Sequence, residues 1–300
     1  MAKTAIKLVT YNIRYSLGRD GRYSLPRITD PIRAADIIAL QEVERGWSRT
    51  GMMDQPEAIG RLLPDFYWVY GPAFDMDASR KDESGRVING RRQFGTMLLS
   101  RWPILSSRLH IFPKFESINE FNMDLGALEG IVATPGEPLR LYSLHLNHNS
   151  SRERLMQLQA LRHIHQQAQI GGGAWCGPGN IDGDDWSAGE TAPPMPREAI
   201  LMGDFNATPN SPEYEFLVGP WQPHVGRIHH ADSFADSWAV VHGEEAPCIT
   251  WRADPHLPAY ERRLDYCFVS GRLAQYVHRA WVDLEAEGSD HCPYWVEMEI

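Results

Sequence analysis

The chain has 300 residues, of which 43% are hydrophobic and 23% are charged, a composition typical of a globular protein with a large core. Its 29 lysine and arginine residues stand against 39 aspartate and glutamate residues, so the formal net charge is −10 at pH 7. Because non-specific nucleic-acid binding depends mainly on cationic side chains that neutralise phosphates, this balance argues against a protein that tracks along a long duplex, although it does not exclude a nuclease with local basic patches.

Two strands are predicted near the start of the chain, and each carries a polar side chain in or after its apolar run. Residues 7–14 form a strand-like run that is interrupted by Asn12. Residues 36–43 contain four near-continuous apolar positions that are followed by Glu42. A polar residue in one strand is usually a satisfied core or edge group, so neither segment alone predicts a site.

The next elements are helices bounded by proline. Residues 26–35 are expected to form a helix, which Pro31 must either start or kink. Residues 55–63 are expected to form another, because Pro56 lies in its first turn and Pro64 follows its end. Strands are expected at residues 66–70 and 94–99.

The densest basic stretch lies between these two strands. Residues 80–92 are expected to form a loop or hairpin around Ser84-Gly85 and Asn89-Gly90. Two interpretations stay open: a solvated turn, or a surface that contacts a substrate phosphate or head group. Its cationic residues are Arg80, Lys81, Arg86, Arg91 and Arg92.

A strand at residues 139–147 contains His145 within an apolar alternation, and a clear helix follows at residues 151–169. Ser150 and Glu153 are expected to form a capping box at its start. Leucine and isoleucine at every third position form its apolar stripe. Its polar residues are expected at the surface, namely Arg152, Arg154, His163 and His165.

Residues 167–197 show no pattern typical of a helix or strand, because they are rich in glycine and proline. They also contain Trp175 and Trp186. A long loop without secondary structure is usually functional or disordered. Both interpretations stay open here: a disordered insertion, or a segment that covers a substrate or a second subunit.

The apolar run at residues 199–202 ends abruptly in Gly-Asp-Phe-Asn-Ala-Thr-Pro, which contains Asp204 and Asn206. An Asx-type turn explains this segment taken alone. A carboxylate and an amide at the end of a strand are also suited to holding a hard cation and a phosphate oxygen.

Two further segments near the end of the chain follow the same pattern. Residues 263–269 carry Asp265, and residues 289–293, also expected to be a strand, carry Asp290 and His291. Burying so many carboxylates is unfavourable unless a cation or hydrogen bonds compensate. The segments together therefore predict one shared site.

In this order, the motifs Leu-Gln-Glu-Val, Gly-Asp-Phe-Asn and Ser-Asp-His resemble those of the endonuclease/exonuclease/phosphatase superfamily, from about residue 6 to residue 300. The resemblance implies a deoxyribonuclease-I-like α/β fold, a four-layer α/β/β/α sandwich of two packed mixed sheets flanked by helices. It also implies a catalytic set of His145, Asp204, Asn206, Asp265 and His291, and a metal-binding set of Asn12, Glu42, Asp204, Asn206, Asp290 and His291.

The resemblance further implies one or two magnesium or manganese ions, held by Glu42 with help from Asn12 and Asp290. His291 is then the general base, and Asp265 fixes its tautomer. Asp204 and Asn206 would orient water, phosphate or a second metal. His145 would donate a hydrogen bond to a non-bridging phosphate oxygen.

Two positions depart from the pattern of the relatives that cleave lipids and small substrates. Thr96 stands where those relatives usually carry asparagine, and Leu125 stands where arginine is common. The loss of a bidentate phosphate-binding group weakens the hold on a charged substrate. Trp251, which precedes Asp265 in the chain, is expected to line the pocket.

The sequence has no run of 18 apolar residues, so it predicts no membrane-spanning helix. Its first residues lack an apolar signal core, which predicts a cytoplasmic protein. The four cysteines have no zinc-type spacing, and no disulfide is expected. Because the candidate residues come from both ends of the chain, we expect residues 1–300 to form one domain with a loop insertion at about 167–197.

The leading prediction is a metal-dependent phosphoester hydrolase, a phosphodiesterase acting on a small molecule or a lipid-like head group. The alternative is a DNA or RNA endonuclease or exonuclease that uses the same site. A non-catalytic binding protein on this fold is a third interpretation, against which the intact set of ligand residues argues.

Overall fold

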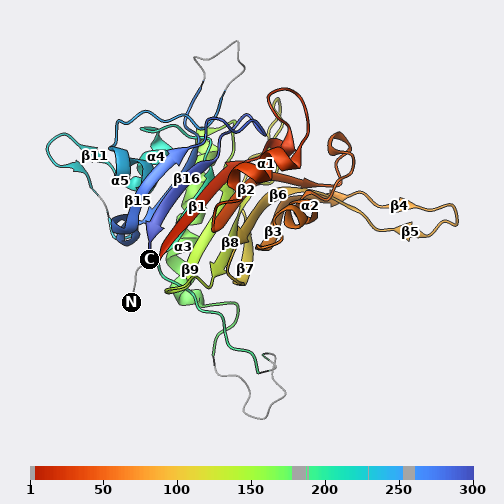
Figure 1. Cartoon of the computed structure of the whole chain (residues 1–300), viewed down its shortest axis with the longest axis horizontal. Helices are drawn as coiled ribbons and strands as arrows, with labels where there is room; N and C mark the ends of the chain where they lie inside the picture. Colours follow the sequence, from red (N-terminus) through yellow and green to blue (C-terminus); the bar gives the residue numbers. More distant parts are fainter. Residues whose placement is uncertain (1–3, 178–186, 188, 229, 253–260) are drawn as a thin grey trace.

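The structure is a computed structural model, and it describes residues 4–177, 187, 189–228, 230–252 and 261–300. Two six-stranded mixed sheets form its centre (Figure 1). The first sheet has the order β15 (Val277–Val282), β16 (Tyr294–Glu299), β1 (Ala5–Asn12), β2 (Ile37–Arg45), β6 (Arg91–Ser100) and β3 (Tyr67–Asp77). The second has the order β13 (Phe234–Asp236), β14 (Asp265–Ser270), β10 (Ala199–Asp204), β9 (Leu139–His145), β8 (Gly126–Val132) and β7 (Ile104–Ile111).

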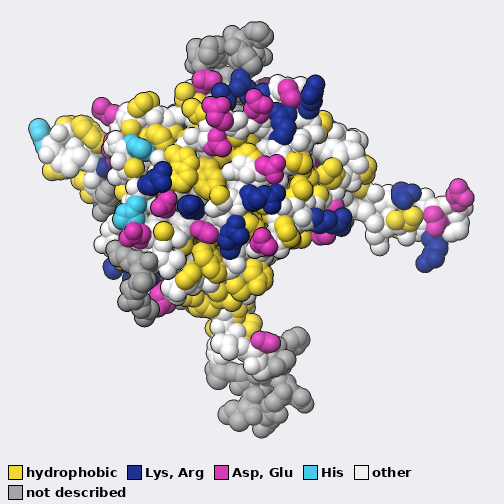
Figure 2. Space-filling view, in the orientation of Figure 1, with side chains coloured by type: hydrophobic (Ala, Val, Ile, Leu, Met, Phe, Trp, Pro, Cys, Tyr) yellow, Lys and Arg dark blue, Asp and Glu magenta, His cyan; other side chains and the backbone are white. Residues whose placement is uncertain are grey.

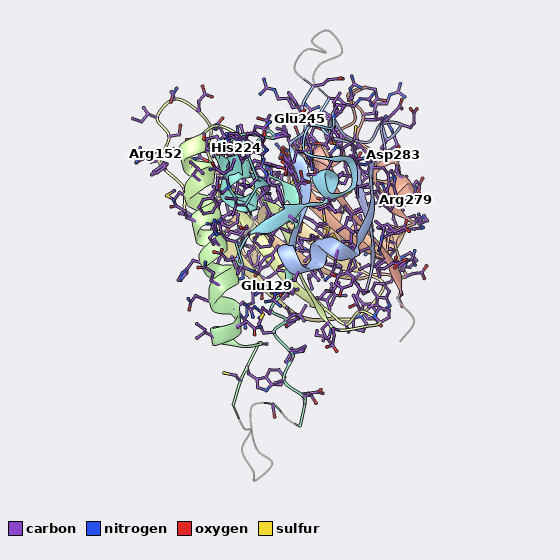
Figure 3. All side chains as sticks on the ribbon, turned by 90° about the vertical axis from the view of Figure 1, so that its left-hand side faces the viewer. Glu129, Arg152, His224, Glu245, Arg279 and Asp283 are labelled. Carbon is purple, nitrogen blue, oxygen red and sulfur yellow. The ribbon has the colours of Figure 1, made fainter. Side chains whose placement is uncertain are left out.

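Helices cover the outer face of each sheet. The longest of them lies along one flank of the molecule, with Arg152 near its N-terminal end (Figure 3). The helices α1 (Leu25–Ile32) and α2 (Gln55–Leu62) pack on the first sheet, and α3 (Ser151–Gly171) and α4 (Pro212–Val218) pack on the second. The other helical segments of the described residues are η1 (Arg14–Ser16), η2 (Ser48–Thr50), α5 (Ser237–His242) and η4 (Gly271–Tyr276).

Three apolar clusters fill the spaces between these layers. The first lies between the two sheets, and the others lie between each sheet and its helices. The alternation of side chains along a strand explains this division, since Leu8 of β1 joins the cluster between the sheets and the next residue, Val9, joins the cluster under α1 and α2. This arrangement confirms the predicted four-layer α/β/β/α sandwich.

Several boundaries differ from those predicted. Pro26 lies in the first turn of α1, whereas Pro31 lies in its last turn and neither starts the helix nor divides it in two. The helix ends one residue later, as expected where a proline removes a backbone donor. Residues 289–293 are not a strand but an irregular segment, in which a single bridge joins Trp251 and His291.

The polar residues of α3 also differ from the prediction. Ser150 accepts a hydrogen bond from the backbone of Glu153, but the Glu153 carboxylate does not complete the capping box and accepts instead from Phe115 N and Asn122 Nδ2. His165 is not a simple surface residue, because its Nδ1 accepts a hydrogen bond from Arg140, a fully buried arginine. Similarly, Arg154 is paired with buried Glu213 rather than solvated.

The predicted basic hairpin is formed by β4 (Arg80–Lys81) and β5 (Val87–Ile88), and a second small hairpin by β11 (Trp221–Gln222) and β12 (Gly226–Arg227). The first extends away from the body of the molecule as an arm, with cationic and acidic side chains near its end (Figure 2). Its tip therefore lies outside the candidate site described below, which supports the interpretation as a solvated turn.

All four cysteines are free. Within the described ranges, no helix is long and apolar enough to cross a membrane.

The helix α3 extends to Gly171, so the loop predicted from residue 167 begins later than expected. Residues 178–186 and 188 of that loop lie outside the described residues. The single-domain organisation stays a prediction.

Candidate active site

Five strand ends place the predicted polar residues along one edge of the two sheets. The strands β1 and β2 are parallel neighbours, as are β9 and β10, so their carboxyl ends meet at the same edge. In the second sheet, Asp204 is the register partner of His145 on one side and of Asp265 on the other. Stacking the sheets then brings Asn12 and Glu42 opposite these three residues.

Asn12 links carboxylates of the two sheets through a pair of hydrogen bonds, one to its own sheet and one to the other. Its Nδ2 donates to Glu42 Oε1 at 3.0 Å and to Asp204 Oδ2 at 2.9 Å. Its Oδ1 accepts from the backbone N–H of Arg14 at 3.0 Å. The fully buried Asn12 therefore fixes two carboxylates from different sheets in one place.

His145, Asp204 and Asn206 form a second connected group. Asn206 Nδ2 lies 3.1 Å from His145 Nε2 and donates to the Leu146 carbonyl at 2.9 Å, while its backbone N–H donates to Asp204 Oδ1. Because Asn206 is the donor, His145 Nε2 is an acceptor and the ring proton of neutral His145 lies on Nδ1. The local Asx-type turn expected at residue 204 is present, and it positions Asn206 for this contact.

His291 and Asp265 form a buried pair. His291 Nδ1 lies 2.8 Å from Asp265 Oδ2, and His291 Nε2 faces Asp204 Oδ2 at 3.7 Å. Burial alone would lower the pKa of His291, but Asp265 and Asp204 outweigh it and raise this pKa to about 10. A general base must be neutral, so this role requires positive charge nearby that offsets the carboxylates.

Asp290 lies at the more open side of the group. Its Oδ2 is 3.5 Å from Arg14 Nη1 and accepts from Trp251 Nε1 at 3.4 Å. Trp251 lines the pocket, as predicted, because its bridge to His291 holds it beside the irregular segment. All eight predicted site residues thus lie in one region.

The backbone around this region is held in an uncommon conformation. Arg14, Tyr15, Glu42 and Asn206 have φ values of +43°, +43°, +58° and +49°. Non-glycine residues in this left-handed region cost about 1–3 kcal/mol each, and such strain clusters at functional sites. These four residues line one cleft. Their strained backbone therefore indicates a functional site at this cleft, independently of the sequence motifs.

The cleft has a volume of about 390 Å³. Besides Leu264, it contains four residues with polar or charged side chains that the motif analysis did not assign to the site: Arg14, Tyr15, His148 and Arg262. Sequence signals existed for two of them, since Arg14 follows Asn12 in the same motif and His148 lies three residues after His145. The other two are recognised only from the fold. Asn12 and Asp265 do not line the cleft and lie behind it.

The side-chain ligand atoms at this cleft fit a divalent cation. Ligand atoms of Asp204, Asp265 and His291 lie within 4.8 Å of one another, and Glu42 and Asp290 add carboxylate oxygens to the same cleft. Such a concentration of partly or fully buried carboxylates is stabilised by a cation, and hard cations such as Mg²⁺ take oxygen ligands. Among the described residues, two buried atoms of this cluster lack a hydrogen-bond partner, His145 Nδ1 and Asp265 Oδ1.

Residues 9–291 match the model of the endonuclease/exonuclease/phosphatase family. No curated protein matches the chain. Among solved structures, it is similar to an endonuclease/exonuclease/phosphatase from Beutenbergia cavernae, at 20% identity and a TM-score of 0.64, covering 99% of this chain and 72% of that chain.

Two other similar structures carry a named activity. One is a mannosyl-6-phosphatase from Bacteroides thetaiotaomicron, at 16% identity and a TM-score of 0.58, covering 97% of this chain and 98% of that chain. The other is ANGEL2, a 2′,3′-cyclic phosphatase, at 18% identity and a TM-score of 0.62, covering 99% of this chain and 96% of that chain. At these identities the structures show the fold alone, which confirms the predicted deoxyribonuclease-I-like fold.

The family model spans nearly the whole chain, and members of the family are phosphoester hydrolases that generally use a divalent metal. The protein belongs to the endonuclease/exonuclease/phosphatase family, and it is a phosphoester hydrolase.

Proposed function

We propose that this protein is a phosphodiesterase that hydrolyses a small or lipid-like phosphoester by in-line attack of water on phosphorus, with magnesium or manganese as its metal. The observation that carries the proposal is the convergence of Glu42, Asp204 and His291 on one cleft, with Asp265 hydrogen-bonded behind His291. These groups come from both sheets and from both ends of the chain.

In this proposal Glu42 and Asp290 hold the metal, together with oxygen atoms of Asp204 and Asn206. When bound, the metal supplies a Lewis acid that polarises a phosphoryl oxygen and stabilises the departing oxyanion. Asn12 was also expected to be a ligand. Its hydrogen bonds to Glu42 and Asp204 support a second role, which is to hold these two carboxylates at the correct separation.

His291 is the proposed general base, and it would take a proton from the attacking water at Nε2. Asp265 accepts from Nδ1 and so leaves Nε2 unprotonated when the ring is neutral. Asp204 and Asp265 raise the pKa of His291, and the positive charge of a divalent cation at this site would lower it. The base is therefore expected to be neutral near pH 7 only in the metal-loaded enzyme.

His145 and Asn206 are proposed to act on the phosphoryl group. Asn206 Nδ2 lies at His145 Nε2, and His145 Nδ1 is buried, so donation from this ring to a non-bridging phosphate oxygen requires Asn206 to give up its contact with Nε2 when the phosphate binds. Arg14 lines the same cleft with a side chain 37% exposed, and its charge favours binding of the phosphate.

A small substrate fits the cleft better than a duplex does. The volume of about 390 Å³ accommodates a phosphate and a modest substituent. The net charge of −10 opposes long-range attraction of a polyanion. The alternative, a DNA or RNA nuclease, is favoured by Arg14 and Arg262 at the cleft and by a similar structure, ANGEL2, that was solved with adenosine-2′,3′-vanadate.

A substrate panel separates these two functions. The purified protein is incubated with bis(4-nitrophenyl) phosphate, sphingomyelin, sugar phosphates, RNA and plasmid DNA, each with Mg²⁺, Mn²⁺ or chelator. We expect metal-dependent hydrolysis of the small diester and little cleavage of plasmid. Efficient nucleic-acid cleavage that weakens steeply with salt would support the nuclease instead.

The cytoplasmic location stays a prediction, which cell fractionation tests.

A further inference from the structure

A second cavity, of about 550 Å³, adjoins the catalytic cleft. The two share Tyr15, Glu42, His145 and His148, so a molecule bound at the cleft has direct access to the second cavity. We call this cavity the apolar pocket. Its apolar lining consists mainly of Trp47, Phe74, Met76, Phe121, Met123 and Leu125.

Three separate parts of the chain build the walls of the apolar pocket. Trp47 comes from the segment after β2, and Phe74 and Met76 come from β3 at the base of the projecting arm. The rings of Trp47 and Phe74 have centroids 5.8 Å apart, and they form one continuous wall. The third part is the segment before β8, which contributes Phe121 and Leu125.

Several polar atoms around the apolar pocket already have partners within the protein. Trp47 Nε1 donates to the Gln93 carbonyl, and Arg49 Nε and Nη2 donate to the buried carboxylate of Glu44. Asn122 donates to Glu153 and the Phe115 carbonyl, and its Oδ1 accepts from Asn147 Nδ2. The other polar lining residues, Tyr15, Glu42, His145 and His148, also line the catalytic cleft. The part of the pocket away from the cleft therefore has few groups left to recognise the polar edges of a sugar or a base.

The rim of the pocket exposes apolar side chains to solvent. Phe121 is 68% exposed and Met76 is 41% exposed. Large apolar residues that are exposed together beside a catalytic cleft mark a binding surface, and methionine adapts to ligands of different shape. The Arg49 guanidinium lies 4.0 Å from the Tyr15 ring centroid and 4.7 Å from that of Trp47, so it packs between these two lining residues.

We propose that the apolar pocket binds an uncharged, apolar organic group that is joined through an ester oxygen to the phosphate at the catalytic cleft. The inference rests on the proposed function, and it names the substrate class as phosphoesters of hydrophobic alcohols. An alkyl chain and an aryl ring share this chemistry. A sugar or nucleobase does not, because its polar edges would be buried without partners.

Non-hydrolysable ligands with one organic group test the inference without requiring turnover. Methyl-, butyl-, hexyl- and phenylphosphonate are titrated into the Mg²⁺-loaded protein by calorimetry, with 6-hydroxyhexylphosphonate as the polar counterpart. We expect the Kd to fall about threefold to fourfold for each methylene that enters the pocket, and phenylphosphonate to bind more tightly than methylphosphonate. The alkyl and phenyl arms distinguish a chain-shaped from a ring-shaped group.

Two exposed rim residues supply the variants, and one neighbour supplies the control. Phe121→Ser and Met76→Ser, from separate segments of the chain, are each expected to reduce the ratio of methyl to hexyl Kd toward one. Ile118→Ser lies in the same segment as Phe121, is 99% exposed and does not line the pocket, so it is expected to keep the wild-type ratio. Thermal unfolding verifies that all three variants are folded.

A flat series of Kd values, no binding by any member, or tighter binding of the hydroxylated ligand would overturn the inference. So would rim variants that keep the full preference. Failure of the proposed function has a different signature: bis(4-nitrophenyl) phosphate is not hydrolysed by the same protein, while the Kd values still fall along the alkyl series.

Discussion

Nδ1 of His291 lies 2.8 Å from Oδ2 of Asp265, and both side chains are buried. The two residues are 26 positions apart in the chain, and isolated bridges join Trp251 both to His291 and to Arg262, which precedes β14. The Thr250 hydroxyl accepts from the backbone N–H groups of Leu264 and Asp265, which fixes the start of that strand. Asp265 is therefore a positioning residue for His291.

Asp265→Asn tests this role. An amide in place of the carboxylate supports the wrong imidazole tautomer, and comparable changes in other enzymes lower kcat by up to about 10⁴-fold. We expect a loss of about 10²–10⁴-fold in kcat, accompanied by a changed tautomer of His291 in nitrogen NMR spectra. Glu285→Gln, an exposed carboxylate change between β15 and His291, is the control. A kcat within threefold of wild type would refute the role.

Asn12→Ala tests whether the link between the sheets organises the metal site. The variant leaves Glu42 and Asp204 without their shared donor, so we expect the Mg²⁺ concentration at half-maximal rate to rise about 10–100-fold. Asn89→Ala, an exposed position on the arm just after β5, provides the matched control. The prediction is wrong if Asn12→Ala shows unchanged dependence on Mg²⁺.

The contact between His165 and Arg140 predicts a pH-dependent stability. Burial and the Arg140 cation lower the pKa of His165 to about 4, whereas an unfolded histidine titrates near 6.5. Between these values the unfolded state binds the additional proton, so stability falls as the pH falls from about 6.5 to 4.

Between pH 7 and pH 4.5, the free energy of unfolding is expected to fall by about 2 kcal/mol less in His165→Gln than in the wild type, after allowance for partial exposure of the histidine. The reason is that glutamine does not titrate. Urea unfolding at pH 7 and pH 4.5 measures the difference. His163→Gln, an exposed change on the same helix, should retain the wild-type pH dependence. Equal pH dependence in His165→Gln and wild type would contradict the pKa assignment.

Much of the fold and the candidate site was predictable, because the polar residues lie at the ends of apolar strands. Parallel pairing of β1 with β2 and of β9 with β10 then places Asn12, Glu42, His145 and Asp204 at one edge. Short-range signals also located the start of α3, where Ser150 caps the helix.

Contacts between distant segments were not predictable from local patterns. Glu153 bonds to the segment before β8 instead of completing a capping box, and Arg154 pairs with Glu213, 59 residues away. The apolar pocket is likewise assembled from separate segments whose individual sequences carry no binding motif. The left-handed conformation of Tyr15 has no signal either, since no glycine marks it.

The most direct test of the account measures Mn²⁺ binding and initial rate together in the wild type, Glu42→Gln, Asp290→Asn and Glu285→Gln. We expect rate and bound Mn²⁺ to rise in parallel in the wild type and in Glu285→Gln. Both site variants, which lie near opposite ends of the chain, should need at least about tenfold more Mn²⁺ and lose rate accordingly. Full activity in chelator, or wild-type binding and turnover in either site variant, would contradict a single metal site built from both ends of the polypeptide.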